Sequence, residues 1–294
     1  MKAYIFPGQG SQFPGMGQEL YKANKEARNL FHKANEILNF DICKLMFEGS
    51  KDDLQQTNVT QPAIFIHSTI LAHCLPNFQP DMVAGHSLGE FSAMVAAKAI
   101  SFEDGLNLVM QRANAMQMAC KQQESTMAAI IGLDANIIEE VCNNANGVVV
   151  TANYNSPNQL VISGETKAIQ HTCEKLNNLG AKRSVILPVG GAFHSPIMNS
   201  AKASLKEVIN KINFETPICP IYQNVCATAI SDKKILKINL IEQLTNPVKW
   251  CQTIENMIHD GASEFYEVGP GNVLIGLNKR INRETQSSKA TVEN

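Results

Sequence analysis

The sequence predicts an α/β protein in which a small second unit is inserted into a larger one. A short apolar run leads into a glycine-rich turn and a helix-forming segment at residues 82–98, which indicates a strand, a tight turn and a helix. Later in the chain the pattern becomes strand, helix, strand, strand, helix, strand, the order of a ferredoxin-like unit. We therefore expect a larger α/β part at residues 1–124 and 193–294, and a ferredoxin-like part at residues 125–192.

The elements of the larger part follow from apolar spacing and from turn residues. We expect strands at 2–6, 82–84, 218–222 and 264–268, and helices at 19–38, 60–75, 90–98, 101–121, 196–212, 235–244, 248–259 and from 272 onward. Pro62 is expected in the first turn of its helix, where proline is tolerated. Ser101 and Asp104 resemble a capping box. The polar tail from Asn282 is expected to be mobile.

The inserted part is expected to contain four short strands and two helices. The strands are placed at 126–133, 148–152, 159–163 and 182–187, and the helices at 135–145 and 165–179. Asp134 is the expected cap of the first helix, and residues 153–158 are the expected turn between the second and third strands.

Composition excludes several classes of protein. Hydrophobic residues make up 44% of the 294 residues and charged residues 18%, which favours a well-buried globular enzyme over a disordered chain. A net charge of −2 gives no overall reason to expect nucleic acid or an anionic membrane as a partner. No run of 18 apolar residues is present, so no membrane span is expected. The eight cysteines are scattered without a C-x-x-C pair, which argues against a metal site and indicates reduced thiols in a cytoplasmic protein.

The turn Gly85-His86-Ser87-Leu88-Gly89 fits a nucleophile elbow. Such a turn presents a serine hydroxyl at a helix N-terminus, where free N–H groups stabilise an oxyanion. The bare pattern also fits a simple glycine-rich turn, so residue logic alone leaves both interpretations open.

A serine nucleophile needs a base, and two histidines are candidates. His194 lies in a loop directly after the last strand of the inserted part, where the two parts meet. His259 ends a helix and is the alternative. His86 is expected to point away from the serine and to shape the pocket.

Two further features bear on a substrate. The loop from Gly8 to Gly15 fits neither a dinucleotide fingerprint nor a P-loop, and its N–H groups are candidates to complete an oxyanion hole. Arg112 lies at the edge of an apolar helix stripe. Either its head is solvated above a buried stem, or its guanidinium binds a substrate carboxylate.

Nine segments, in order over residues 2–281, resemble the malonyl-CoA:acyl carrier protein transacylases of bacterial fatty acid synthesis. They are FPGQGSQ at 6–12, TQPA at 60–63, GHSLGEFSA at 85–93, QR at 111–112, MAAIIGL at 127–133, NYNSP at 153–157, GAFHSPIM at 191–198, QLTNPVKW at 243–250 and EVGPG at 267–271.

The resemblance implies a role for each matching residue. Ser87 matches the nucleophile of the family and His194 its general base. The remaining matches are Gln9 and Leu88 as backbone oxyanion hole, Arg112 as partner of the malonyl carboxylate, Gln243 as the carbonyl that orients the histidine, and Gln61 as a pocket-lining residue.

The resemblance also implies an α/β-hydrolase-like core, no cofactor, malonyl-CoA and acyl carrier protein as substrates, and a monomer. The GAFHS form of the histidine segment also occurs in acyltransferases of polyketide synthases, so a discrete polyketide acyltransferase is the alternative. A serine hydrolase of the same core fold and a catalytically silent carrier-binding subunit are the other rivals.

Overall fold

The larger part of the molecule is built on a six-stranded sheet. The computed structural model describes residues 1–292. The strand order is β10-β9-β1-β2-β7-β8, and all neighbours are parallel except β7 and β8. The strands are β1 (Lys2–Phe6), β2 (Met82–Gly85), β7 (Ile221–Tyr222), β8 (Ala229–Ile230), β9 (Glu264–Glu267) and β10 (Gln286–Lys289).

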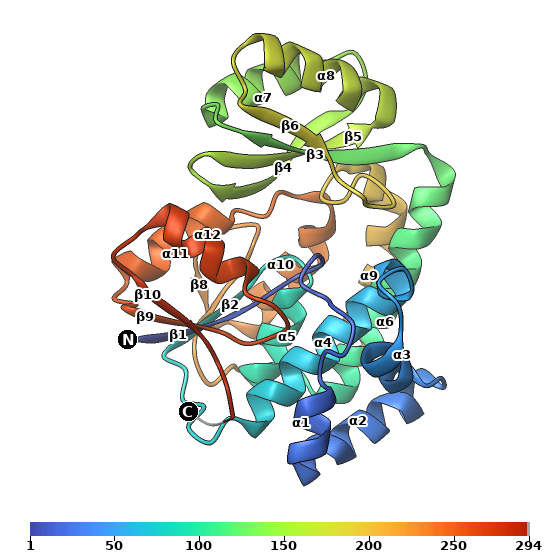
Figure 1. Cartoon of the computed structure of the whole chain (residues 1–294), viewed down its shortest axis with the longest axis vertical. Helices are drawn as coiled ribbons and strands as arrows, with labels where there is room; N and C mark the ends of the chain where they lie inside the picture. Colours follow the sequence, from blue (N-terminus) through green and yellow to red (C-terminus); the bar gives the residue numbers. More distant parts are fainter. Residues whose placement is uncertain (293–294) are drawn as a thin grey trace.

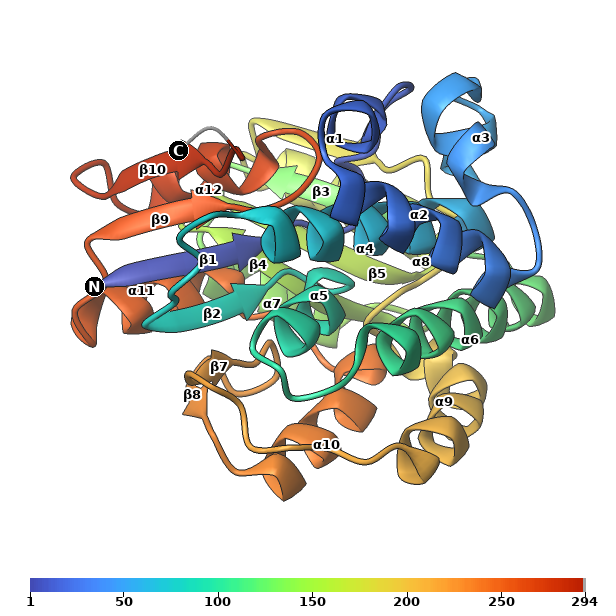
Figure 2. The same ribbon diagram turned by 90° about the horizontal axis from the view of Figure 1, so that it is seen from below.

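Helices cover both faces of this sheet (Figures 1 and 2). One face carries α4 (Thr57–Cys74), α5 (Gly89–Ala96) and α6 (Phe102–Gln122), with α1 (Gln18–Ala23), α2 (Lys25–Leu38), α3 (Ile42–Glu48), α9 (Asn199–Lys211) and α10 (Lys233–Glu242) outside them. The other face carries α11 (Trp250–His259) and α12 (Val273–Ile281). Short 3-10 helices lie at η1 (Asp53–Gln55), η2 (Pro196–Met198) and η3 (Gln243–Thr245).

Burial on both faces explains why β1 is apolar at nearly every position. Ala3 and Ile5 pack against α11 and α12, whereas Tyr4 and Phe6 belong to the core on the opposite face. A parallel strand covered on both sides requires such a continuous apolar run rather than an alternating one.

The inserted part is a four-stranded antiparallel sheet with the order β4-β5-β3-β6. Its elements are β3 (Ser125–Ile131), α7 (Ala135–Asn143), β4 (Val149–Ser156), β5 (Gln159–Glu165), α8 (Thr166–Asn178) and β6 (Arg183–Ile186). Figure 1 shows α7 and α8 on the outer side of this sheet. Met127, Ala129 and Val161 point the other way, into the core of the larger part, so the two sheets enclose shared space.

The predicted helix at 19–38 is wrong as a single element, because the chain breaks at Asn24. Asn24 is extended (φ −124°), and its side chain accepts hydrogen bonds from the N–H groups of Glu26 and Ala27. It therefore ends α1 and caps α2. The apolar periodicity runs across the break, which is why spacing alone indicated one helix.

Two predictions about the N-terminal ends of helices also need correction. Helix α4 begins at Thr57, since the N–H groups of Val59 and Thr60 both donate to the carbonyl of Gln56. Pro62 consequently lies in the second turn, not the first. Asp134 occupies the cap position of α7 but accepts no side-chain hydrogen bond there.

The turn expected at 153–158 is much shorter than predicted. Strand β4 continues to Ser156, with irregular pairing that interrupts its register to β5 twice. The asparagines at 153 and 155, which are typical turn residues, are strand residues here, and they are buried.

The part of the tail at residues 282–292 contains a strand where mobility was expected, and residues 293–294 of that tail lie outside the described residues. Gln286–Lys289 forms β10, the outermost strand of the large sheet, paired in parallel with β9. A polar edge strand needs only one partner and one set of hydrogen bonds, so its apolar signal is weak. The structure also adds α3 and β8, which the spacing did not predict. Within residues 1–292, none of the helices combines the length and apolarity needed to cross a bilayer.

Candidate active site

Ser87 lies in a tight turn between the end of β2 and the start of α5. Its backbone is left-handed, with φ at +52°, which costs a residue with a side chain about 1–3 kcal/mol. A Cβ on Gly85 would lie 2.0 Å from the backbone of Gly89, and a Cβ on Gly89 would lie 2.0 Å from the carbonyl oxygen of Phe6. The two glycines therefore permit a turn that no larger residue would.

Gly85→Ala is expected to destabilise the fold by about 3 kcal/mol or more, because the new methyl group meets backbone atoms that cannot move aside. Gly276→Ala in α12 is the matched control, since nothing lies within 4 Å of its added Cβ. We expect the control to gain about 0.5–1 kcal/mol from better helix propensity. Chemical denaturation of both variants measures the difference. Equal stabilities would contradict this account of the turn.

His194 lies beside Ser87, although 107 positions separate them in the chain. Its Nε2 is 2.7 Å from the Ser87 Oγ. Its Nδ1 is 2.9 Å from the carbonyl oxygen of Gln243 and 3.2 Å from that of Asn246. A carbonyl only accepts, so Nδ1 carries the proton and Nε2 presents its lone pair to the serine hydroxyl. The other candidate, His259, is exposed at the end of α11 and does not line the cavity around Ser87.

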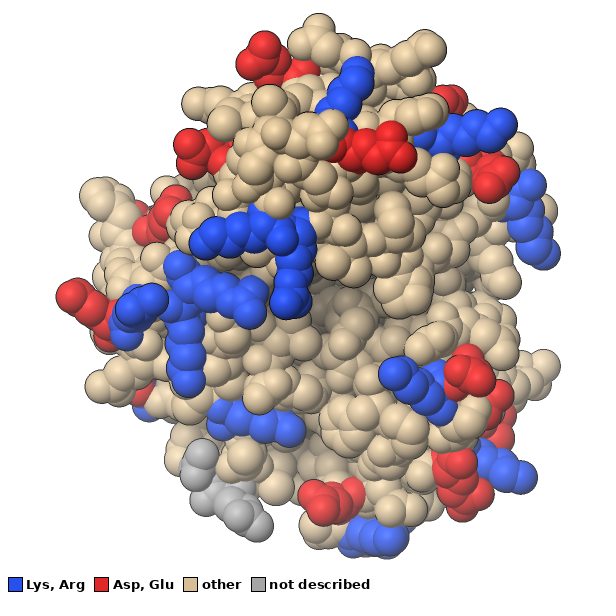
Figure 3. Space-filling model, turned by 45° about the horizontal axis from the view of Figure 1, so that its top comes forward, with Lys and Arg blue, Asp and Glu red and all other residues tan. Residues whose placement is uncertain are grey.

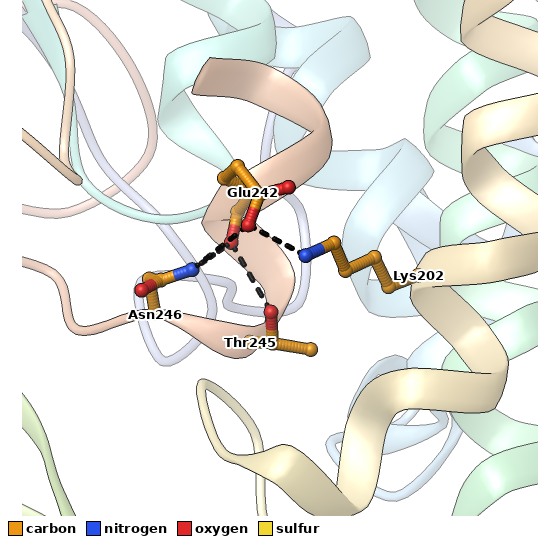
Figure 4. A network of polar contacts seen from close by, with 4 residues as sticks. All are labelled: Lys202, Glu242, Thr245 and Asn246. Atoms are coloured by element: carbon orange, nitrogen blue, oxygen red, sulfur yellow. Dashed lines mark hydrogen bonds and ion pairs between the residues drawn. The ribbon is translucent and has the colours of Figure 1, made fainter. Parts of the chain in front are cut away.

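The segment that holds His194 is itself held by polar contacts (Figure 4). Lys202 of α9 forms an ion pair of 2.5 Å with Glu242. The Asn246 amide donates to the backbone carbonyl of Glu242 at 2.8 Å, and the Thr245 hydroxyl donates to the same carbonyl at 3.4 Å. The two carbonyls that face the imidazole thus come from a braced turn.

Arg112 is one of the most buried charges of the protein, with 2% of its surface exposed. The interpretation with a solvated head is therefore wrong. Nη1 donates to the Gln61 side chain at 2.8 Å, and Nη2 lies 3.1 Å from the Ser87 Oγ and 3.4 Å from the Gln243 side chain. Burial lowers the pKa of Arg112 to about 10, so the guanidinium is charged at neutral pH. No carboxylate of residues 1–292 forms an ion pair with it.

Ser87, His194 and Arg112 line one cavity of about 160 Å³ between the two sheets. Gln61, expected to line the pocket, is not among its lining residues and contacts the site through Arg112. The cavity is lined by Gln9, His86, Ser87, Leu88, Arg112, Met116, Met127, Asn153, Asn155, Val161, Leu187, Val189, Phe193 and His194. The backbone N–H groups of Gln9 and Leu88 donate to no other protein group within residues 1–292. They are thus available to a ligand. Figure 3 shows the molecular face with a hollow near its centre and Lys and Arg side chains gathered on one side of it.

His86 and Gln243 each make a side-chain contact that the sequence did not indicate. The Nε2 of His86 is 2.8 Å from the Asn155 side chain, so the imidazole lies against the inserted part. The Gln243 side chain donates to the Ser87 carbonyl at 2.9 Å, in addition to the contact of its backbone with His194.

Sequence reasoning missed Asn224, Asn246 and Glu90. Asn224 is fully buried and accepts a 2.7 Å hydrogen bond from the Ser87 N–H. The fully buried Glu90 accepts one of 2.7 Å from the Asn224 N–H. A signal for Asn224 was present, because it follows the predicted strand at 218–222, and polar residues at carboxyl ends of parallel strands meet at one sheet edge. Asn246 and Glu90 gave no such signal.

Burial, and secondarily the charge of Arg112, lowers the pKa of His194 to about 3. We therefore expect the reactivity of Ser87 toward an uncharged serine reagent to persist down to about pH 5, where an ordinary histidine, with pKa about 6.5, is protonated. The measurement is the rate of labelling against pH. Glu90→Gln is the control, because burial raises the pKa of Glu90 to about 7 and its titration falls in the same range. An acid limb near pH 6.5 in both proteins would refute the lowered pKa.

Comparison with known proteins gives a consistent family. The model of the acyl transferase domain matches residues 3–292. A malonyl CoA-acyl carrier protein transacylase of Staphylococcus aureus (strain MRSA252) is 40% identical over 287 residues, covering 97% of this chain and 93% of the relative. The protein of the same name from Bacillus subtilis (strain 168) is 41% identical over 290 residues, with coverages of 97% and 92%.

Solved structures agree over nearly the whole chain. The malonyl CoA-acyl carrier protein transacylase of Coxiella burnetii superimposes with a TM-score of 0.96 at 38% identity, covering 99% of this chain and 94% of that one. A malonyl-transacylase in complex with its type II PKS acyl-carrier protein gives 0.95 at 35% identity, with coverages of 98% and 95%. The mixed α/β architecture is therefore shared, and the chain belongs to the acyl transferase domain family, among the malonyl CoA-acyl carrier protein transacylases.

Proposed function

We propose that this protein transfers a malonyl group from malonyl-CoA to the phosphopantetheine thiol of acyl carrier protein, through a malonyl ester on Ser87, for fatty acid chain elongation. The observation that carries the proposal is the pairing, in one cavity, of a serine hydroxyl bonded to a neutral imidazole with a buried guanidinium that forms no ion pair with a carboxylate of residues 1–292. The first provides a nucleophile, and the second provides a receptor for a substrate carboxylate. The names of the relatives support the same substrates.

In the first half-reaction His194 Nε2 accepts the proton of Ser87 as its Oγ attacks the thioester carbonyl. The N–H groups of Gln9 and Leu88 stabilise the oxyanion, and Arg112 binds the malonyl carboxylate. The carbon–sulfur bond then breaks, and the coenzyme A thiol leaves with the proton from His194. Gln243 supports this step by keeping the imidazole in the correct tautomer through its carbonyl, and Gln61 holds the guanidinium.

The second half-reaction reverses these steps with a different thiol. The pantetheine thiol of acyl carrier protein gives its proton to His194, its sulfur attacks the ester carbonyl, and Ser87 leaves and regains a proton. No metal or redox cofactor enters this scheme. Acyl carrier proteins are typically acidic, and the Lys and Arg side chains beside the hollow in Figure 3 suit such a partner.

We also propose the finer structural assignment and the setting. The larger part, residues 1–124 and 193–294, is an α/β-hydrolase-like core, and residues 125–192 are a ferredoxin-like subdomain. The strand order β4-β5-β3-β6, with both helices on one face, supports the second assignment. The protein acts in the cytoplasm as a monomer, without nucleic acid or membrane as a partner.

The test is intact-protein mass spectrometry after mixing the protein with malonyl-CoA. A stable malonyl adduct that acyl carrier protein discharges supports the proposal. Free malonate without an adduct indicates a serine hydrolase, and neither adduct nor turnover indicates a silent carrier-binding subunit.

A polyketide synthase acyltransferase is the second candidate, favoured by the likeness to a transacylase solved with its type II PKS carrier. The chemistry is the same, and only the carrier differs. Comparing discharge rates with a fatty-acid carrier and with a polyketide carrier decides between the two, since the physiological carrier is expected to react faster.

A further inference from the structure

The buried side chain of Asn224 spans the nucleophile turn from outside it. Asn224 Oδ1 accepts the N–H of Ser87 at 2.7 Å, while Asn224 Nδ2 donates to the carbonyl of Gly85 at 2.6 Å. One partner only donates and the other only accepts, so the orientation of the amide is determined. A single side chain thereby connects the last residue of β2 to the nucleophile across the strained turn.

Asn224 is in turn held by the neighbouring elements. Its backbone N–H donates to Glu90 Oε2 at 2.7 Å, and Glu90 Oε1 accepts from the Gln223 side chain at 3.2 Å. Its backbone carbonyl accepts the N–H of Lys249 at 3.1 Å. Glu90 lies in the first turn of α5, where a carboxylate interacts favourably with the helix dipole. Helix α5, which follows Ser87, therefore carries Glu90. Glu90 in turn holds Asn224, which contacts the backbone of Ser87.

We propose that Asn224 is a positioning residue, which keeps Ser87 in its left-handed conformation with the hydroxyl directed at His194, and that Glu90 holds Asn224 in place. Without the amide, the Ser87 N–H and the buried Gly85 carbonyl would both lose the hydrogen bond that Asn224 gives them. The turn would relieve this, and its backbone strain, by rotating toward ordinary backbone angles. That rotation would move Oγ away from Nε2, and a displacement of about 1 Å costs on the order of 100-fold in rate.

This inference rests on the proposed nucleophilic role of Ser87, but it does not depend on the substrate. The probe is therefore a fluorophosphonate, whose phosphorus forms a bond to Ser87 Oγ as fluoride leaves and His194 takes the proton. A wild-type protein that does not react would contradict the proposed function. A wild-type protein that reacts, together with a variant that reacts equally fast, would contradict only this inference.

Asn224→Ala is expected to slow labelling on the order of 100-fold. Asn256→Ala is the matched control, because the Asn256 amide also donates to a backbone carbonyl of the same loop, that of Ala227 at 2.8 Å, without touching the turn. The control is expected to label at the wild-type rate. Circular dichroism establishes that both variants are folded.

Asn224→Asp distinguishes positioning from a general structural role. A protonated aspartic acid has the shape of asparagine and donates to the Gly85 carbonyl, whereas an aspartate does not donate. Its carboxyl would face Glu90 from α5, with Arg112 and His194 beyond Ser87 and Lys249 behind the loop, and burial beside Glu90 favours protonation. We expect this variant to be as slow as Asn224→Ala at about pH 8 and to approach the wild-type rate at about pH 5.

The ratio of variant to wild type is the quantity to compare, because it removes the pH dependence that the two proteins share. In the variant the new carboxyl and Glu90 titrate as a coupled pair. A ratio that does not change with pH would overturn the proposal, as would an Asn224→Ala variant that labels at the wild-type rate. If Asn224→Ala does not fold, the ratio for Asn224→Asp decides alone.

Discussion

Ser87→Ala is expected to abolish the malonyl adduct, and His194→Ala to slow its formation on the order of 10⁴-fold or more. The Ser87 Oγ lies 2.7 Å from His194 Nε2, so its loss removes the site of ester formation itself. The histidine variant retains the hydroxyl but has no group to take its proton. The two effects are not additive, because the residues act as one unit. Intact mass against time after adding malonyl-CoA measures both.

Ser92→Ala is the matched control for the serine. Ser92 is fully buried on the helix that follows the turn, and its hydroxyl has no hydrogen-bond partner within residues 1–292. Its removal is expected to leave adduct formation unchanged. If Ser87→Ala formed as much malonyl adduct as the wild type, another residue would be the nucleophile and the proposed mechanism would be refuted.

Local chemistry explains which parts of this site were predictable from the sequence. A Cβ on Gly85 or on Gly89 would lie 2.0 Å from a backbone atom, of Gly89 in the first case and of Phe6 in the second. These steric constraints leave a local pattern in the sequence, with one glycine two residues before Ser87 and one two residues after it. The order of elements in the inserted part is likewise a local signal of period and turn. The predicted strand, turn and helix around Ser87 are confirmed by β2 and α5, and the predicted order of elements in the inserted part is confirmed by β3 to β6.

Contacts between distant residues explain what was not predictable. The hydrogen bond from Ser87 to Asn224 joins residues 137 positions apart, and the bond from Asn224 to Glu90 returns over 134. No periodicity encodes such a pair. The prediction of a turn at residues 153–158 was wrong for a related reason. The preference of asparagine for turns was outweighed by burial of Asn153 and Asn155 against the cavity. The prediction of a mobile tail was wrong at residues 286–289, because β10 is held by hydrogen bonds to β9 and has no apolar pattern of its own to reveal it.

The burial of Arg112 shows the limit of helical spacing most clearly. A position at the edge of an apolar stripe fits a solvated head as well as a buried one. The position of the Arg112 side chain is determined by partners on other elements, Gln61 of α4 and Gln243 of η3. Both side chains are neutral and accept hydrogen bonds from the guanidinium. These neutral partners hold the guanidinium in place and leave its charge for a ligand.

Arg112→Ala is expected to lower malonyl transfer on the order of 10²–10³-fold while leaving acetyl transfer nearly unchanged. Removing one partner of a buried, hydrogen-bonded charge pair costs about 3–5 kcal/mol, and that cost applies only when the acyl group carries a carboxylate. With an acetyl group the buried guanidinium gains no partner on the substrate, so its loss removes no favourable contact with the acyl group. The preference for malonyl over acetyl therefore falls by about the same factor.

Arg112→Lys separates charge from geometry in this prediction. Lysine retains a positive charge but lacks the planar fork that binds a carboxylate through two parallel hydrogen bonds, so we expect a preference between those of the native protein and the alanine variant. Initial rates of adduct formation from malonyl-CoA and acetyl-CoA give the ratio for each protein. An unchanged ratio in Arg112→Ala would exclude the guanidinium as the carboxylate receptor. Because Nη2 also lies 3.1 Å from the Ser87 Oγ, a loss of both rates by an equal factor would instead assign Arg112 to the nucleophile. The ratio, not either rate alone, therefore determines its role.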